Sequence, residues 1–355
     1  MSTALTVIIA LLVFGFLIFI HEFGHYIFAR IFKVTISEFS IGMGPKLVTY
    51  DSKKTGIKYA LGMFPIGGYV AMVGEDEETD DPNAFNRKPA WQRFIITAAG
   101  AAVNIVVGFL AMIIITSVIN IGNTTVHSFM TEADFEELEG VSYEASSSKY
   151  GLMAGDTITH VNGKRVKIAD ELSYQIMRWG NEPVDLTVER DGKTVELPGV
   201  RFPTITDQGQ SFGTMDFYVT AIDKGVFDTL GIAFRKACLV MRMCWESIYD
   251  LITGRYTVAA ISGPVGISSA IGDAAKAGFI SLLNITVIIS INLGFMNLLP
   301  IPALDGGRLI TIAIEMITRR RLPAKVEGMI NAVGFALLMV LTVVILIKDV
   351  FTLIN

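Results

Sequence analysis

Five consecutive residues carry the clearest chemical pattern in this sequence: His21-Glu22-Phe23-Gly24-His25. On a helix, residues four apart project from the same face, so both imidazoles can bind one zinc ion. Glu22 can then take a proton from a water molecule bound to that ion. The pattern directly follows a charge-free apolar segment, 4–20. Because an ionisable group at the middle of a bilayer costs about 2.5–3.5 kcal/mol, we expect these three to serve a function.

A catalytic zinc site needs a third protein ligand and one open position. Asp305 is the favoured candidate, because it follows a later apolar segment and directly precedes Gly306-Gly307. Pro300 and Pro302 interrupt the helix just before it and free backbone polar groups at membrane depth. The sequence therefore predicts a zinc site made by two distant membrane segments.

The composition excludes several classes of protein. Charged residues make up 18% of the 355-residue chain, against about 25% in ordinary globular proteins, and apolar residues make up 52%. These values exclude a disordered chain, a coiled coil and an ordinary cytosolic enzyme. The net charge of −5 and the lack of a polybasic tract argue against a nucleic-acid partner. Two cysteines, Cys238 and Cys244, give neither a disulfide framework nor a CxxC metal site.

The apolar residues are concentrated in four blocks, each near or above the roughly 20 residues that cross a bilayer. Lys and Arg number nine in 30–93 and five in 303–327, with none before Arg30 and only Lys348 after residue 327. Since basic loops stay in the cytoplasm, we expect both termini and the long segment between the second and third blocks to be extracytoplasmic. The four blocks are 4–20 with its continuation to about 32, 94–119, 278–304 and 329–347.

The long polar segment reads as a mixed α/β domain over 122–205. Asn162-Gly163 and Asp191-Gly192 are typical of tight hairpin turns between alternating strands. Apolar spacing over 168–179 predicts a helix between them. A cluster of Thr, Asp, Gln, Gly and Ser near 205–213 marks the end of the domain.

Two further segments have patterns that leave their roles open. Residues 226–252 read as an amphipathic helix, which lies on the bilayer surface or packs on the soluble domain. Residues 57–73 are strongly apolar, although they lie in a cytoplasmic loop, and their glycines and Pro65 favour a β-hairpin over a helix. Such a hairpin either fills space under the helices or contacts the substrate.

These patterns together resemble the site-2 protease family of intramembrane zinc metalloproteases, in its RseP-type bacterial branch. HExxH stands at 21–25, and Asn297–Gly307 (NLLPIPALDGG) fits the NxxPxPxLDGG motif of the family at every fixed position. Gly151–Gly163 resembles the start of a PDZ domain. Shorter similar stretches lie at 42–47, 64–70 and 85–88.

The resemblance implies roles for individual residues. It implies that His21, His25 and Asp305 bind Zn²⁺, that Glu22 is the general base, and that Asn297 lies near the scissile peptide.

The same resemblance makes the 57–73 hairpin a membrane-associated element that presents an edge to an extended substrate. Gly67, Gly68 and Tyr69 are then substrate-binding residues. Pairing of strands suits this task, because a substrate helix must unwind before a protease can reach its carbonyl groups.

Two features depart from the family pattern. Ala101 follows Gly100 where the family often has proline, which puts a local kink of the second span in doubt. The soluble region has room for one PDZ-like domain, whereas enterobacterial relatives carry two, which weakens any size-exclusion mechanism based on a tandem pair.

The expected fold is thus a polytopic α-helical membrane protein with four transmembrane helices, a membrane-associated β-hairpin and one extracytoplasmic PDZ-like α/β domain. The expected divisions are a first transmembrane helix (1–34), a cytoplasmic loop (35–91), a second transmembrane helix (92–120), the PDZ-like domain (122–205), an amphipathic helix with its connector (213–277), a third transmembrane segment (278–307), a basic cytoplasmic loop (308–327) and a fourth transmembrane helix (328–350).

The expected function is zinc-dependent hydrolysis of peptide bonds in or near transmembrane helices, in a bacterial inner membrane. By resemblance, the substrates are single-span proteins already trimmed by another protease, such as anti-sigma factors in a stress response or remnant signal peptides. The lipid bilayer and peptide C-termini at the PDZ-like domain are the other expected partners.

Two alternatives differ in chemistry. A membrane metalloprotease that cleaves soluble or lipidated chains takes a glutamate as third ligand, for which only Glu315 and Glu327 lie near the later spans. A zinc-free relative that merely retains membrane partners has no need of the base Glu22.

Overall fold

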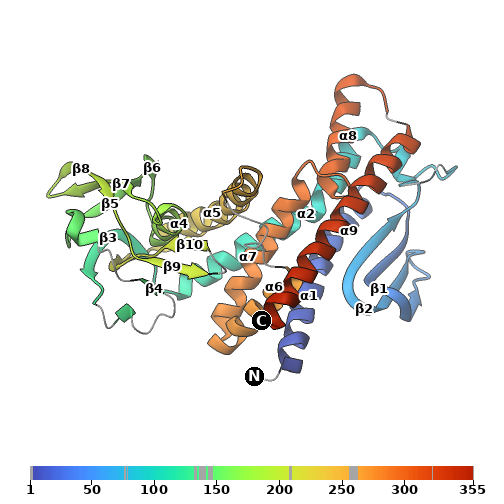
Figure 1. Ribbon diagram of the computed structural model, residues 1–355. Coiled ribbons are helices and arrows are strands. Elements are labelled where there is room, and N and C mark those ends of the chain that lie inside the picture. The colour runs from blue at the N-terminus through green and yellow to red at the C-terminus, as the bar shows by residue number, and fades with distance from the viewer. Residues whose placement is uncertain are drawn as a thin grey trace. The chain divides into compact units, whose positions relative to one another are not determined.

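The structure is a computed structural model that forms two compact units (Figure 1). The membrane unit comprises 1–112, 240–248 and 261–355, and the second unit comprises 113–239 and 249–260. The residues described are 3–75, 77, 79–131, 134–135, 141–142, 147–207, 210–255, 263–321 and 323–354, so parts of the predicted 122–205 domain lie outside them.

Four helices of the described residues are long and apolar enough to cross a membrane, as the sequence predicts. Their span candidates are Ala4–Ile31, Ala90–Val118, Phe279–Leu298 and Val326–Asp349. They lie in helices α1 (Thr3–Ile31), α2 (Ala90–Val118), α7 (Phe279–Leu298) and α9 (Ala324–Ile354), which are accompanied by the shorter helices α6 (Pro264–Ala277) and α8 (Asp305–Thr318).

The chain between α7 and α8 is short and irregular. Helix α7 ends at Leu298 because Pro300 and Pro302 lack the backbone N–H groups that would continue it. A new helix begins at Asp305 and runs to Thr318. The expected basic loop over 308–327 is therefore wrong for its first half, which is helical, and Asp305 stands at the start of a helix.

Strands β1 (Ile36–Asp51) and β2 (Lys58–Met72) form one antiparallel sheet. The register pairs Ser40 with both Tyr69 and Ala60, so the first half of β1 lies between the two halves of β2. The expected hairpin within 57–73 is thus wrong in its pairing, because its two arms are separated by an upstream strand. Both strands fold back where Gly42 and Gly67 adopt positive φ angles of 80° and 83°.

The β1–β2 sheet exposes a set of large apolar side chains. An exposed apolar patch of this kind on a membrane protein is suited to contact with lipid. Its members are Met43, Leu47, Val48, Leu61, Met63 and Phe64, each at least 46% exposed.

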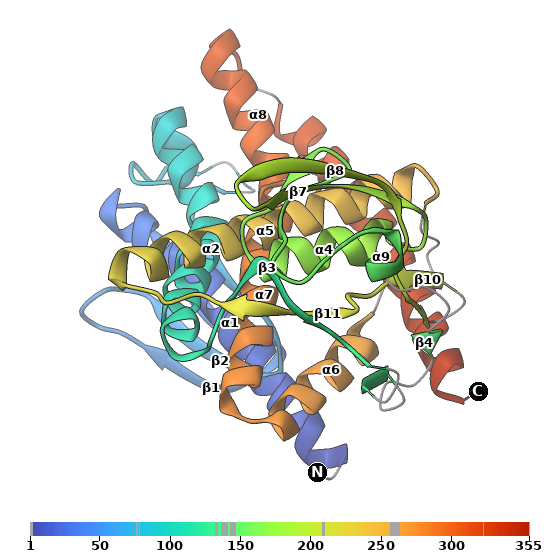
Figure 2. The ribbon, with the colours of Figure 1, turned by 90° about the vertical axis from the view of Figure 1, so that its left-hand side faces the viewer.

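The second unit is built on an antiparallel sheet with one helix, α4 (Ala169–Trp179), packed beside it (Figure 2). The strand order is β11-β3-β5-β7-β8, with β6 paired to β5, while β10, β9 and β4 form a separate small sheet. These strands are β3 (Gly122–Phe129), β4 (Val141–Ser142), β5 (Thr157–Val161), β6 (Lys164–Arg165), β7 (Val184–Arg190), β8 (Lys193–Val200), β9 (Thr204–Asp207), β10 (Gln210–Gly213) and β11 (Phe217–Ala221).

The two tight turns predicted from sequence both have the required backbone conformation. Asn162 and Gly163 have φ angles of 48° and 74°, and Asp191 and Gly192 have 49° and 74°. Two successive positive φ angles match the twist of the flanking strands.

The sheet extends beyond the expected end of the domain at residue 205. Strand β11 pairs with β3, with Ala221 opposite Gly122, so the first and last strands lie side by side. The predicted boundary near 205–213 is instead occupied by the β9–β10 hairpin.

Helix α5 (Val226–Ile252) is tied to α4 by ion pairs. Lys236 lies 2.9 Å from Asp170, and Arg178 makes two hydrogen bonds of 2.7 and 2.8 Å to Asp250. One side of α5 therefore packs on α4 of the second unit, which is one of the two interpretations left open by the sequence. A second side of α5 remains exposed and apolar, with Phe227, Leu230, Phe234, Trp245, Tyr249 and Ile252 along it.

Candidate metal centre

His21 and His25 lie one turn apart on α1, inside the first candidate span. Their Nε2 atoms are 3.2 Å apart, and the two rings are nearly perpendicular. The side chains are 12% and 11% exposed. The HExxH spacing thus places two imidazole nitrogens at one point within an apolar helix.

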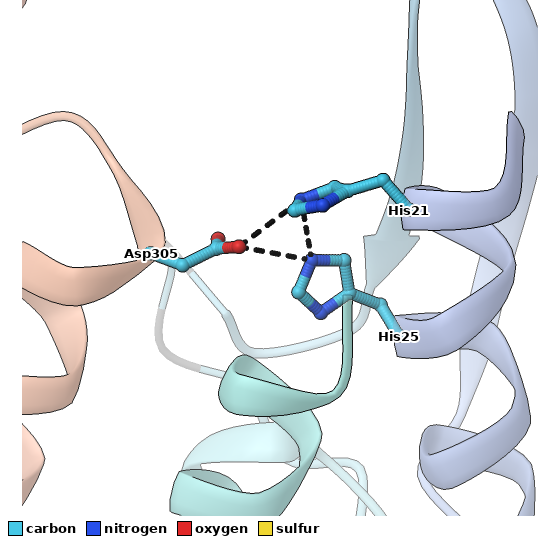
Figure 3. Close-up of side chains that lie close together, drawn as sticks. All are labelled: His21, His25 and Asp305. Atoms are coloured by element: carbon cyan, nitrogen blue, oxygen red, sulfur yellow. Dashed lines mark hydrogen bonds and ion pairs between the residues drawn. The ribbon is translucent and has the colours of Figure 1, made fainter. Parts of the chain in front are cut away.

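Asp305 approaches the same point from the first turn of α8 (Figure 3). Its Oδ2 atom lies 3.0 Å from His21 Nε2 and 3.4 Å from His25 Nε2. The three possible ligand atoms lie within 4.8 Å of one another. Two neutral imidazoles and one carboxylate form a ligand set that fits zinc and leaves a fourth position open.

Helix α2 supplies a contact to the other ring nitrogen, Nδ1, of each histidine. His25 Nδ1 is 2.9 Å from the Ile96 carbonyl oxygen. His21 Nδ1 is 3.5 Å from the side-chain amide of Asn104, which is fully buried. Asn104 lies inside the apolar block 94–119, and the sequence prediction assigned it no role. The cost of burying a polar side chain in a membrane span was the signal that could have singled it out.

Close packing of α1 on α2 depends on two glycines. A Cβ atom at Gly24 would lie 2.5 Å from the Ala99 carbonyl oxygen, and one at Gly100 would overlap the His25 ring. Helix α2 continues through this point from Ala90 to Val118 without interruption. The departure from the family's proline thus leaves a continuous helix here.

Glu22 sits between the metal ligands and the β1–β2 sheet. The backbone N–H of Val70 on β2 faces its carboxylate. Gly68 also lies close to Glu22, since a Cβ atom there would lie 3.2 Å from Glu22 Cγ. The second arm of β2 therefore runs directly beside the candidate base.

The alternation of backbone groups shows which side of β2 faces Glu22. Successive N–H groups of an antiparallel strand point alternately toward and away from the partner strand. The Val73 N–H donates to the Thr35 carbonyl across the pair (2.9 Å), so the Val70 N–H points away from β1 and the Tyr69 N–H points toward it. In the described part of the chain, no strand pairs with this outer side of β2.

The remaining hairpin residues have different surroundings. Gly67 makes the turn with positive φ described above. The Tyr69 hydroxyl donates to Glu38 (2.8 Å) and accepts a hydrogen bond from Lys46 (2.7 Å). The adjacent Lys46 ammonium also holds the pKa of the Glu38 carboxyl below its ordinary value. The Tyr69 side chain thus joins a polar cluster on the sheet.

Asn297 lies half-buried on the last turn of α7. Among the described residues, no hydrogen bond or ion pair links it to the histidines or to Asp305. Its proximity to the scissile peptide stays a prediction.

The two glutamates proposed as alternative third ligands lie in a different cluster. Glu315 pairs with Arg93 at 2.5 Å, and Glu327 accepts a hydrogen bond from Thr311 at 3.1 Å. Within the described residues, the group with metal-binding geometry consists of His21, His25 and Asp305. This arrangement does not support the glutamate-ligand alternative.

Comparison with known proteins bears directly on this centre. The model of peptidase family M50 matches residues 9–341. The chain belongs to peptidase family M50. This membership confirms the resemblance to site-2 proteases, and the M50 chain is accordingly a zinc metalloprotease and a membrane protein.

Three relatives of this M50 chain are similar over nearly their whole length. A protein of Clostridium acetobutylicum whose name describes a zinc metalloprotease is 34% identical over 98% of both chains. The zinc metalloprotease RasP of Geobacillus kaustophilus is 28% identical over 98% of both chains. The regulator of sigma-W protease RasP of Bacillus subtilis is 26% identical, covering 97% of this chain and 98% of that relative.

Proposed function

We propose that this M50 peptidase hydrolyses peptide bonds in or near the transmembrane helices of single-span proteins. The observation that carries the proposal is the position of the His21, His25 and Asp305 cluster, because both histidines lie on an apolar helix long enough to cross a membrane. A protease whose ligands lie at membrane depth acts on bonds at that depth. Glu22, beside the cluster, is the proposed general base.

The chemistry divides between the metal and the side chains. His21, His25 and Asp305 would hold zinc, which when bound would activate a water molecule and polarise the scissile carbonyl group. Glu22 accepts the proton of the attacking water and then delivers it to the leaving amine nitrogen. Asn297 is proposed to hold the polar backbone of the substrate near the cut.

The outer side of β2 is proposed to bind the substrate as an added strand. An unwound substrate segment has unpaired backbone groups, which cost several kcal/mol each in lipid unless they find partners. The N–H and carbonyl groups on the outer side of β2, from Gly68 onward, are proposed to supply such partners next to Glu22. The proposed site residues Gly67, Gly68 and Tyr69 shape the start of this edge.

We further propose an orientation and a role for the second unit. Because basic loops stay in the cytoplasm, both termini and the second unit are proposed to lie on the extracytoplasmic side of a bacterial inner membrane. The sheet and α4 of this unit are proposed to form one PDZ-like domain that binds peptide C-termini and controls which substrates enter. The exposed apolar side of α5 is suited to rest on the membrane surface.

The proposed substrates are proteins already trimmed by another protease. The name of the Bacillus subtilis relative refers to regulation of sigma-W, and single-span anti-sigma factors are the first proposed class. Remnant signal peptides are the second proposed class. Both fit regulated intramembrane proteolysis in a stress response.

The test is a comparison of membrane proteomes from cells that express the normal chain or Glu22→Gln. Single-span fragments should accumulate only with Glu22→Gln, and Glu182→Gln, the same change at an exposed site of the second unit, serves as control. Equal fragment levels in all three strains would contradict the proposal. They would instead favour the alternative of a non-catalytic relative, which zinc analysis of the purified chain would test independently.

A further inference from the structure

Asn104 is placed where it can control the protonation pattern of a metal ligand. It is fully buried on α2, and its side-chain nitrogen lies 3.5 Å from His21 Nδ1. Its side-chain oxygen, Oδ1, is buried and has no hydrogen-bond partner among the described residues. A buried amide oxygen without a partner is costly, so its position calls for an explanation.

The two orientations of the amide group have opposite consequences for His21. When the amide nitrogen faces Nδ1, it donates, so Nδ1 must be the bare nitrogen and Nε2 carries the proton. A protonated Nε2 has no lone pair for a metal. When the amide is turned by 180°, Oδ1 accepts a hydrogen bond from Nδ1–H, and the Nε2 lone pair is free.

We propose that Asn104 is a positioning residue that holds His21 in the tautomer able to bind zinc, through a hydrogen bond from Nδ1–H to Oδ1. The inference rests on the proposed metal site. One rotation of the amide gives the orphaned Oδ1 a partner and leaves Nε2, which already lies 3.0 Å from Asp305 Oδ2, with a free lone pair. Metal-binding histidines in general donate their second ring nitrogen to an acceptor of this kind.

His25 provides an internal comparison on the same helix. Its Nδ1 faces the Ile96 carbonyl oxygen at 2.9 Å. A carbonyl oxygen only accepts, so His25 must carry its proton on Nδ1, with Nε2 free for the metal. Ile96 and Asn104 are eight residues apart on α2, which is close to two helical turns. One face of α2 thus holds both histidines in the same tautomer, once through the main chain and once through a side chain.

A purely structural role accounts less well for the side chain. The link from Asn104 to α7 runs through its main-chain carbonyl, which accepts a hydrogen bond from Ser290 at 2.9 Å. Any residue at position 104 would supply that carbonyl. The amide itself points to His21.

The test compares two substitutions of nearly equal size in the purified full-length chain. Asn104→Asp keeps an acceptor for Nδ1–H, whereas Asn104→Leu removes it. Zinc affinity is measured by competition with a chelator, and thermal stability is measured on the zinc-free chain. Thr116→Val, which removes a buried hydroxyl without a partner among the described residues from the same helix, is the control.

We expect Asn104→Leu to weaken zinc binding about 10–100-fold, while Asn104→Asp and Thr116→Val stay within a few-fold of the normal chain. The stability of the zinc-free chain should follow the opposite order, because aspartate buries a charge and leucine does not. Normal zinc affinity in Asn104→Leu, or an equal loss in both variants, would overturn the inference. Failure of the normal chain to bind zinc would instead overturn the proposed metal site.

Discussion

The backbone N–H of Val70, on the unpaired side of β2, faces the carboxylate of Glu22 on α1. The proposed base therefore lies directly against the proposed substrate-binding edge. A substrate strand that pairs with this edge competes for the same N–H group. Proton transfer by Glu22 and substrate binding by β2 are therefore expected to be coupled.

Glu22→Gln should lower turnover at least about 10²–10⁴-fold, because the amide cannot accept a proton from water. Zinc content should be unchanged, since Glu22 is not among the three converging ligands. Metal analysis and cleavage of a reconstituted single-span substrate check both points. Turnover close to normal would show that another group is the base.

Asp305→Asn should lower both zinc content and activity, because a neutral amide oxygen is a weaker ligand than a carboxylate. Glu22→Gln is the matched control, because it also converts a carboxylate to an amide but at a residue that is not one of the three ligands. Full zinc occupancy in Asp305→Asn, with only the rate reduced, would remove Asp305 from the ligands.

Val70→Pro removes the N–H group that points away from β1, whereas Val70→Ala retains it. If the edge pairs with substrate, the proline should slow cleavage of a helical substrate more than cleavage of one with Gly or Pro near the cut, whose unwinding costs less. Equal slowing of both substrates would indicate that only the contact to Glu22 was lost.

A proline at Tyr69 would not test substrate pairing with the outer side of β2. The backbone N–H of Tyr69 faces β1, so its loss would damage the β1–β2 sheet itself. Tyr69→Phe should also have an effect of its own, since the hydroxyl bonds both Glu38 and Lys46.

The PDZ-like unit should select substrates without taking part in the chemistry. Gly122 and Ala221 are paired across β3 and β11, so their Cα atoms are about 5 Å apart and a short linker can replace 123–220. The shortened chain should still cleave a short, pre-trimmed substrate and should admit longer ones. A folded, zinc-loaded deletion variant that fails on the short substrate would contradict this role.

The Arg178–Asp250 pair should be important for the attachment of α4 to α5. Both side chains are at most 5% exposed, so Asp250→Leu leaves a buried guanidinium without its carboxylate, at a cost of about 3–5 kcal/mol. Hydrogen exchange of the α4 amides should speed up accordingly. The double variant Arg178→Leu/Asp250→Leu should recover most of the protection, and no recovery would point to a loss of packing instead.

Local patterns predicted much of the fold and the site. Charge-free blocks predicted the four spans, and the i, i+4 spacing predicted that His21 and His25 converge. Asn162-Gly163 predicted its turn because few other residues accept positive φ there.

Long-range pairing was harder to predict. Strand 36–41 lies between two arms of β2 that are closer to each other in sequence, and nothing local specifies that order. The position of β11 beside β3 and the role of Asn104 are likewise set by segments about 90 residues away.

The packing of α1 on α2 has a consequence for the pattern of damaging mutations. Neither Gly24 nor Gly100 has a side chain that could bind metal, polarise a bond or move a proton. Yet adding a single methyl group at Gly100 fills the volume of the His25 imidazole. A map of inactivating mutations should therefore mark these two positions as strongly as the ligands, because any side chain at either position would overlap atoms of the facing helix.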